Sequence, residues 1–214
     1  ALKGLLLPLD ELPNTFPIAS SFPGFASPAI LEGSRFGLPA AGDVMLLISS
    51  KANPGESDSW QSILDSRAKV SINLNDPNGL FYTALYQSSG GSFTDANARP
   101  HLDSAALSAM IQFLRSAKSA GTLSNWTIQA ATWKQASENY TAGRMDYQVN
   151  WFSQGIVNAV NQYTFENIPG LVKIPATALT GWYWASANPV IEKQSVRIEL
   201  IAFLAQPAFS SPWS

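Results

Sequence analysis

Few side chains in this sequence are suited to acid–base, nucleophilic or metal chemistry. The chain has 214 residues, no cysteine and a single histidine, His101. Thiol nucleophiles and thiolate metal sites are therefore excluded, and most histidine-based schemes of proton transfer have no basis. Two carboxylates, Asp43 and Asp76, form a conceivable pair for glycoside hydrolysis, which needs two acids at a defined separation. The sequence does not fix that separation, and we expect neither catalysis nor a metal or other cofactor.

The charge of the chain excludes one class of partner. The 13 Lys and Arg residues stand against 15 Asp and Glu residues, and charged residues make up 13% of the chain, about half of the ~25% typical of soluble domains. Such a chain has no basic surface that follows phosphates, so we expect no nucleic-acid partner. No apolar run reaches the ~18 residues that a membrane-spanning helix needs. We expect any membrane anchor to lie outside these residues.

Strands and helices alternate along the sequence, which predicts an α/β fold. The apolar run Val44–Ile48 is typical of a strand buried on both faces. Asp76 followed by Pro77 predicts the start of a helix, and Asp103 caps an amphipathic helix that stops at Gly121. Further predicted strands cover Arg35–Pro39, Val70–Leu74, Met145–Asn150, Leu171–Ile174 and Trp182–Ala187, and further helices cover Ser59–Arg67, Ala130–Ala142 and Ile191–Ala205.

Six short segments occur in an order that matches a known family. They are Gly4–Leu12, Arg35–Asp43, Trp60–Ile63, Leu85–Gly91, Tyr140–Met145 and Ile174–Trp182. Together they resemble extracellular solute-binding protein family 1 of bacterial ABC importers, in the sugar-binding branch that includes maltose-binding protein. None of the segments is specific alone, and their order and spacing over nearly the whole chain carry the resemblance.

The resemblance implies a fold like that of type II periplasmic binding proteins, in which two lobes joined by crossing strands close on a ligand. Residues 43–170 would form one complete α/β lobe, a mixed sheet with helices on both faces. Residues 1–42 would supply part of the second lobe and the first hinge strand, and residues 171–214 the return crossing and further parts of that lobe. The chain would then be the central fragment of a longer protein and would bind ligand weakly alone.

The resemblance also implies ligand-binding positions around two acids. Asp43 follows the first crossing strand, where the family often places a carboxylate that faces the ligand. The alternative is a turn or hinge residue that bonds its own backbone. Asp76 lies between a strand and a helix, where the family presents a polar residue, but it is also well placed to cap that helix. Asn75 and Asn78 share this junction.

The remaining implied ligand-binding residues are mostly aromatic. Sugar sites combine flat aromatic faces with hydrogen-bonding groups that match the hydroxyls. Trp151 and Phe152 follow a strand, at a position where the family places an aromatic residue that stacks on the ligand. The alternative is that they are buried in the core of the lobe, as aromatic residues usually are. Gly181 matches the glycine of the return crossing, and Trp182 opens a Trp-Tyr-Trp run. Strand alternation places the two tryptophans on one face and the tyrosine on the other, so at least one set should be core.

The function implied by the resemblance is non-catalytic. The protein would be extracytoplasmic, either periplasmic or a cell-surface lipoprotein of a bacterium. It would bind a carbohydrate-like small molecule and deliver it to the membrane subunits of an ABC transporter. Two alternatives stay open, a ligand-sensing or interaction domain with the same fold and a glycoside hydrolase, because fold similarity alone does not separate such functions.

Overall fold

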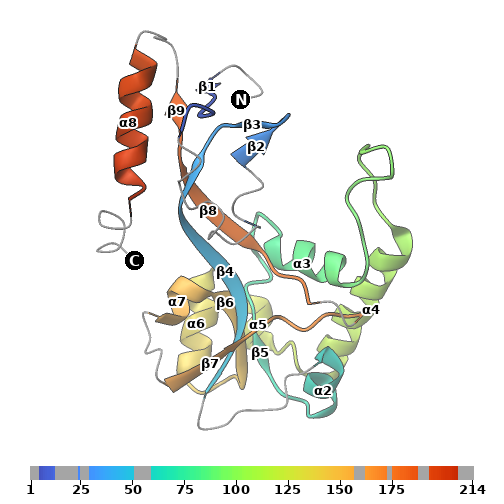
Figure 1. Ribbon diagram of the computed structural model, residues 1–214. Helices are drawn as coiled ribbons and strands as arrows, with labels where there is room; N and C mark the ends of the chain where they lie inside the picture. The colour runs from blue at the N-terminus through green and yellow to red at the C-terminus, as the bar shows by residue number, and fades with distance from the viewer. Residues whose placement is uncertain are drawn as a thin grey trace. The chain divides into compact units, whose positions relative to one another are not determined.

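The chain forms two compact units. The computed structural model describes residues 5–12, 24, 29–50, 59–156, 162–172, 175–187 and 193–206. The first unit comprises residues 1–43 and 179–214, and the second comprises residues 44–178 (Figure 1).

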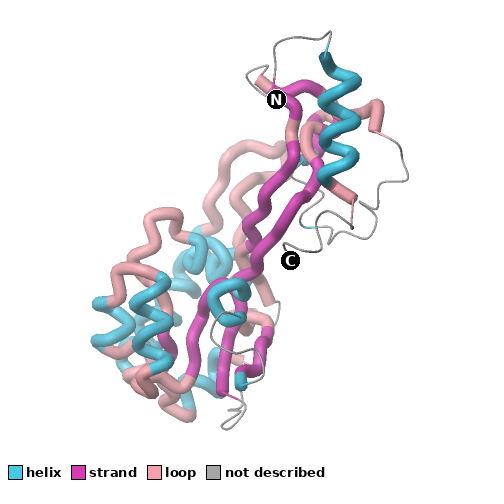
Figure 2. Tube along the Cα trace, turned by 90° about the vertical axis from the view of Figure 1, so that its left-hand side faces the viewer, coloured by secondary structure: helices cyan, strands magenta, loops and turns pink. Residues whose placement is uncertain are grey.

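The second unit is built around strand β4 (Leu38–Ser50), whose residues from Val44 onward belong to it. β4 pairs antiparallel with β6 (Tyr147–Trp151) on one edge and with β7 (Tyr163–Glu166) on the other. β5 (Val70–Ser71) pairs parallel with β6. The sheet order is therefore β5–β6–β4–β7, and β8 (Leu179–Trp184) pairs with β4 off this path. Figure 2 shows the strands in magenta and the helices in cyan. This confirms the predicted mixed sheet.

Helices cover both faces of this sheet (Figure 1). The helices on one face are α2 (Trp60–Asp65), α3 (Leu80–Ser88) and α4 (Ser104–Ala120), whose buried side chains share a core cluster with Met45 and Leu47. The opposite face is covered by α6 (Trp133–Thr141) and α7 (Phe152–Ile156). Ser71 Oγ donates to the backbone carbonyl of Ala136 in α6, and Gly155 of α7 lies close to Ile48 and Phe165. A short helix, α5 (Asn125–Gln129), follows α4.

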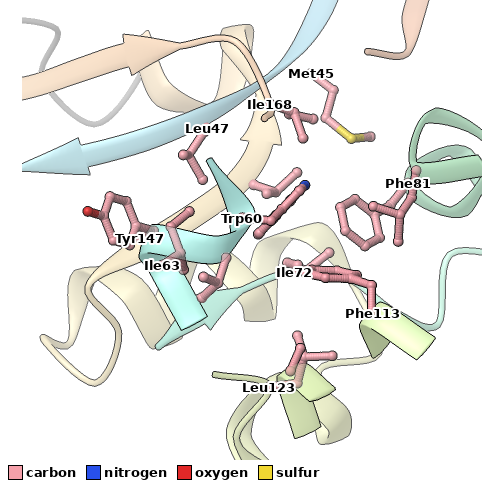
Figure 3. Packing of buried hydrophobic residues seen from close by; sticks show 14 residues of the cluster. Met45, Leu47, Trp60, Ile63, Ile72, Phe81, Phe113, Leu123, Tyr147 and Ile168 are labelled. Atoms are coloured by element: carbon pink, nitrogen blue, oxygen red, sulfur yellow. The ribbon is translucent and has the colours of Figure 1, made fainter. Parts of the chain in front are cut away.

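The main core is formed by alternate side chains of the strands and by three aromatic rings of the helices. Met45 and Leu47 are two residues apart on β4 and therefore point to the same face, where they meet the helical side chains (Figure 3). The Trp60 ring lies 4.9 Å from the Phe113 ring and 6.3 Å from the Phe81 ring. These contacts tie α2, α4 and α3 to one another over the sheet.

Local capping signals explain where α4 begins and ends. The Asp103 side chain accepts hydrogen bonds from the N–H groups of Ala105 and Ala106, and Gly121 adopts a φ of 83° just after the helix. Both features match the prediction. The bonds from Ala106 and Ala105 lower the pKa of the Asp103 carboxyl, because they stabilise its charged form.

Several predicted boundaries are wrong. The strand expected over Val70–Leu74 covers only Val70–Ser71, and the helix expected from Ala130 begins at Trp133. Pro39 does not close a strand: it is the second residue of β4, a position near a strand start that proline tolerates. The helix expected at Asp76 begins only at Leu80, because residues from Asp76 to Gly79 form a turn. Leu171 and Val172 form a turn rather than a strand, since the Val172 N–H donates to the Ser88 carbonyl. Residues 173–174 of that expected strand lie outside the described residues.

The first unit has a smaller core. β1 (Leu6–Leu7) pairs with β9 (Ser186–Ala187), and β2 (Ile30–Leu31) forms a hairpin with β3 (Ser34–Arg35). It also contains β8 (Leu179–Trp184) and α8 (Gln194–Leu204). Its buried apolar residues are Leu9, Leu12, Leu38, Ile198 and Ile201.

Steric constraints explain why glycine occupies positions 90 and 91, at the end of the segment Leu85–Gly91 that contributes to the family resemblance. Gly90 ends α3 with a φ of 89°, and a Cβ at Gly91 would lie 2.3 Å from Cζ of Tyr86. The Tyr86 hydroxyl donates to the Ser92 carbonyl (2.9 Å) and accepts from the Asp103 N–H (2.6 Å). Glycine thus allows the tyrosine to lie over the backbone and to connect the end of α3 to the start of α4.

We expect the Tyr86→Phe substitution to lower the free energy of unfolding by about 1–3 kcal/mol, because it removes two hydrogen bonds to partly buried backbone groups, each worth about 0.5–1.5 kcal/mol. Urea unfolding followed by circular dichroism measures the loss. Tyr82→Phe is the matched control: the Tyr82 hydroxyl makes one bond, to the Leu74 carbonyl, in a half-buried position. Equal losses for the two variants would contradict this account of Tyr86.

Candidate ligand-binding site

The carboxyl ends of β5 and β6 define the candidate site in the second unit. The two strands are parallel, so both end at the same edge of the sheet, and ligands of open α/β sheets bind outside such an edge. Residues 75–78 follow β5, and Trp151 and Phe152 lie at the end of β6. The structure therefore brings five of the eight sequence-predicted residues, Asn75, Asp76, Asn78, Trp151 and Phe152, to one edge.

The polar side chains of this edge are engaged with the backbone. Asn75 Nδ2 donates to the carbonyls of Ile128 (3.3 Å) and Ala130 (2.9 Å), which holds the loop after α5 beside the junction. Asp76 Oδ1 accepts from the Asn78 N–H (3.1 Å), and Oδ2 accepts from the Leu80 N–H (3.2 Å). The Asp76 carboxylate therefore bonds its own turn and the first N–H group of α3. The prediction that Asp76 is the N-cap residue is wrong, because that position belongs to Gly79, which makes no side-chain capping bond. Asn78 is exposed at the same turn.

Two tryptophans pack together at the edge. Trp133 is the first residue of α6, after the N-cap Thr132, and its ring lies 6.3 Å from the Trp151 ring at an interplanar angle of 69°. Both rings are half-buried and pack against the main core. The side chain of Asn150, one residue before Trp151, accepts a hydrogen bond from the Trp151 N–H (2.8 Å). The pair therefore presents partly exposed aromatic surface on a fixed support.

Trp133 was not among the sequence-predicted site residues. The available signal was Thr132, a capping residue that marks Trp133 as the first residue of a helix. Phe152 has a different environment from Trp151, because its ring packs edge-on against Phe165 at 5.1 Å. This contact favours a packing role for Phe152.

The remaining predicted residues belong to the first unit. Asp43 does not follow a strand, as was expected, but lies within β4, where it is 8% exposed. Gly181 and Trp182 lie within β8, where Trp182 is 59% exposed. Tyr183 is half-buried, and its Cβ would be 3.1 Å from a Cβ at Gly37. The Trp182 and Tyr183 side chains thus lie on opposite faces of β8, as strand alternation predicts.

A cavity of about 720 Å³ occurs in another part of the second unit. It is lined by residues of α2, α4 and the segment from Glu166 to Pro175, and none of the sequence-predicted site residues lines it.

In the part of the chain that the structure describes, no three His, Asp or Glu residues are grouped to hold a metal ion. No helix among the described residues is long and apolar enough to cross a membrane.

The sequence profile of the bacterial extracellular solute-binding proteins matches residues 1–210. The match spans nearly the whole chain, and the protein belongs to this family. A search of curated protein sequences found no match.

Solved structures of the same fold include sugar-binding proteins. Maltose-bound MalE3 of T. maritima superposes with a TM-score of 0.76 at 16% identity, over 98% of this chain and 60% of that one. The GacH receptor of Streptomyces glaucescens gives 0.75 at 14% identity over 98% and 58%. An ABC transporter solute-binding protein of Thermotoga lettingae with bound α-D-tagatose gives 0.72 at 18% identity over 99% and 60%. These confirm the type II periplasmic-binding-protein fold, and this chain spans about 60% of the length of MalE3.

We expect Asp76→Ala to destabilise the second unit by about 1 kcal/mol, because it removes the acceptor of two backbone hydrogen bonds in a partly exposed turn. Chemical denaturation of the variant measures this change. Asn78→Ala is the control, because the Asn78 side chain is exposed and the bond to Asp76 comes from the Asn78 backbone. A destabilisation below about 0.3 kcal/mol for Asp76→Ala would show that these two hydrogen bonds do not hold the turn.

Proposed function

We propose that this protein binds a neutral carbohydrate or a similar polyol without transforming it, and delivers it to the membrane subunits of an ABC importer. The observation that carries the proposal is the Trp133–Trp151 pair at the carboxyl edge of a sheet, in a chain of a solute-binding family. Aromatic faces cover the C–H surface of sugar rings and do not require a charged ligand. The extracellular family supports an extracytoplasmic location, and we propose a lipoprotein anchor outside these residues.

The charges at this edge support a neutral ligand. Asp76 is its one acid among the predicted residues, and both carboxylate oxygens already accept backbone hydrogen bonds. Lys134, next to Trp133 on α6, lies 3.8 Å from Glu138 in an exposed ion pair. The solved structures of the same fold that contain maltose, tagatose or D-mannitol are consistent with this ligand class.

Ligand binding is tested by thermal unfolding and tryptophan fluorescence in the presence of maltose, maltotriose, tagatose and mannitol. A ligand that binds only the native state raises its stability by about 2.7 kcal/mol at a hundredfold excess over Kd. We expect at least one of these compounds to raise Tm, without release of new reducing ends. Because this chain alone is expected to bind weakly, the panel extends to ligand concentrations far above those that saturate a tight site. The absence of any shift at these concentrations, or hydrolysis of the sugar, would contradict the proposal.

The role of the aromatic pair is tested in the same assay. We expect Trp151→Ala and Trp133→Ala each to weaken binding about tenfold, which is ~1.4 kcal/mol, and Trp151→Phe to retain most of the affinity because it keeps a ring. The matched control is Trp126→Ala: Trp126 is 50% exposed and stacks with Arg144 at 4.2 Å, near the amino end of β6. Equal losses for Trp126→Ala and Trp151→Ala would contradict the assigned site.

A further inference from the structure

The cavity between α2, α4 and the segment from Glu166 to Pro175 shares no lining residue with the candidate ligand-binding site. Its volume of about 720 Å³ lies within the range of about 300–1,000 Å³ that is usual for small-molecule pockets. All the residues that line it belong to the second unit. The cavity is therefore formed by one unit alone and is large enough for a small organic molecule.

One wall of this cavity is apolar and continuous with the main core. Trp60 and Phe113 line it, and they are 3% and 9% exposed, with their rings 4.9 Å apart. Leu64 and Leu171 also line it and pack against the same core cluster. Because the core holds these side chains in place, the wall is a preformed apolar surface of the kind that small-molecule sites use.

The indole N–H of Trp60 is a buried donor without an acceptor. In the part of the chain that the structure describes, Trp60 Nε1 is shielded from solvent and makes no hydrogen bond. Buried donors are nearly always paired, because an unmade hydrogen bond leaves the cost of desolvation uncompensated. Since Trp60 lines the cavity, an acceptor oxygen bound there can supply the missing partner.

The charge of the lining selects the sign of a ligand. Among the described residues that line the cavity, Glu166 is the one ionisable group, and none is Lys, Arg or His. β7 pairs Glu166 with Leu47, and directly opposed residues of two strands project to the same face of a sheet. The carboxylate is therefore on the face that carries α2 and α4, where Leu47 joins the core. Gln112 and Ser116 of α4 add amide and hydroxyl groups, so the lining favours a cation over an anion.

We propose that this cavity is a second binding site, and that its ligand is a small primary amine with an apolar body and a hydroxyl group. The protonated amino group pairs with the Glu166 carboxylate, and the hydroxyl oxygen accepts from the Trp60 N–H. The apolar body lies against the wall that Leu64 and Leu171 help to form. The inference does not depend on the proposed function, because it uses no residue of the candidate sugar site.

The first test compares three compounds of similar size. Calorimetry measures the binding of tyramine, phenethylamine and 4-hydroxyphenylacetate to the 214-residue chain. We expect tyramine to bind about tenfold more tightly than 4-hydroxyphenylacetate, which has a carboxylate in place of the amine, and about threefold more tightly than phenethylamine, which lacks the hydroxyl. No detectable binding of tyramine up to about 10 mM, or equal affinities for the amine and the carboxylate, would overturn the proposal.

The second test uses two pairs of variants to assign the binding to this cavity. Glu166→Gln removes the charge and should weaken tyramine binding about fivefold, whereas Glu138→Gln changes an exposed acid of α6 and should have no effect. Ser116→Phe places a ring at an exposed lining position of α4 and should abolish binding. Ser108→Phe, at an exposed position of α4 outside the lining, should leave the affinity unchanged. Wild-type affinity for tyramine in either Glu166→Gln or Ser116→Phe would show that the amine binds elsewhere and would overturn the assignment.

Discussion

The second unit depends on one strand that is hydrogen-bonded along both edges. From Met45 to Ser49, β4 pairs with β6, and from Leu47 to Ser50 it pairs with β7. A strand in this position is buried on both faces, and only a nearly continuous apolar segment meets that requirement. The register that follows sets Met45 opposite Trp151. The position of the candidate aromatic pair is therefore a consequence of how β4 pairs, and not of the residues around Trp151 alone.

A second constraint is the need to satisfy backbone groups where strands end. The loop after β5 leaves backbone N–H groups without a strand partner, and the Asp76 carboxylate accepts from two of them. The Asn75 side chain instead donates to the carbonyls of Ile128 and Ala130 at the end of α5. The same side chains had been predicted to face a ligand. Because their polar atoms are engaged locally, the aromatic surface of Trp133 and Trp151 is what the edge still offers. These polar side chains thus hold the backbone of the edge that also carries the two tryptophans.

Elements with local signals were predictable from the sequence, and elements that depend on distant contacts were not. The helix α4 carries its own cap at Asp103 and its own stop at Gly121, so both ends were correct. Strand β7 has no such signal: its four residues become a strand because they pair with β4, more than a hundred residues earlier in the chain. Trp133 was missed for the same reason, since its importance comes from Trp151 on another element.

In the tryptophan-rich strand β8, the alternation of side chains can be interpreted only once the residue that packs against the strand is known. Alternation alone predicts two faces but does not say which one is packed. The answer comes from Gly37, which lacks a side chain and so lets the Tyr183 side approach it closely. Had Gly37 been a larger residue, this close approach would have been blocked. A single glycine distant in sequence thus helps to decide that the tyrosine packs and that the two tryptophans lie on the more exposed face of the strand.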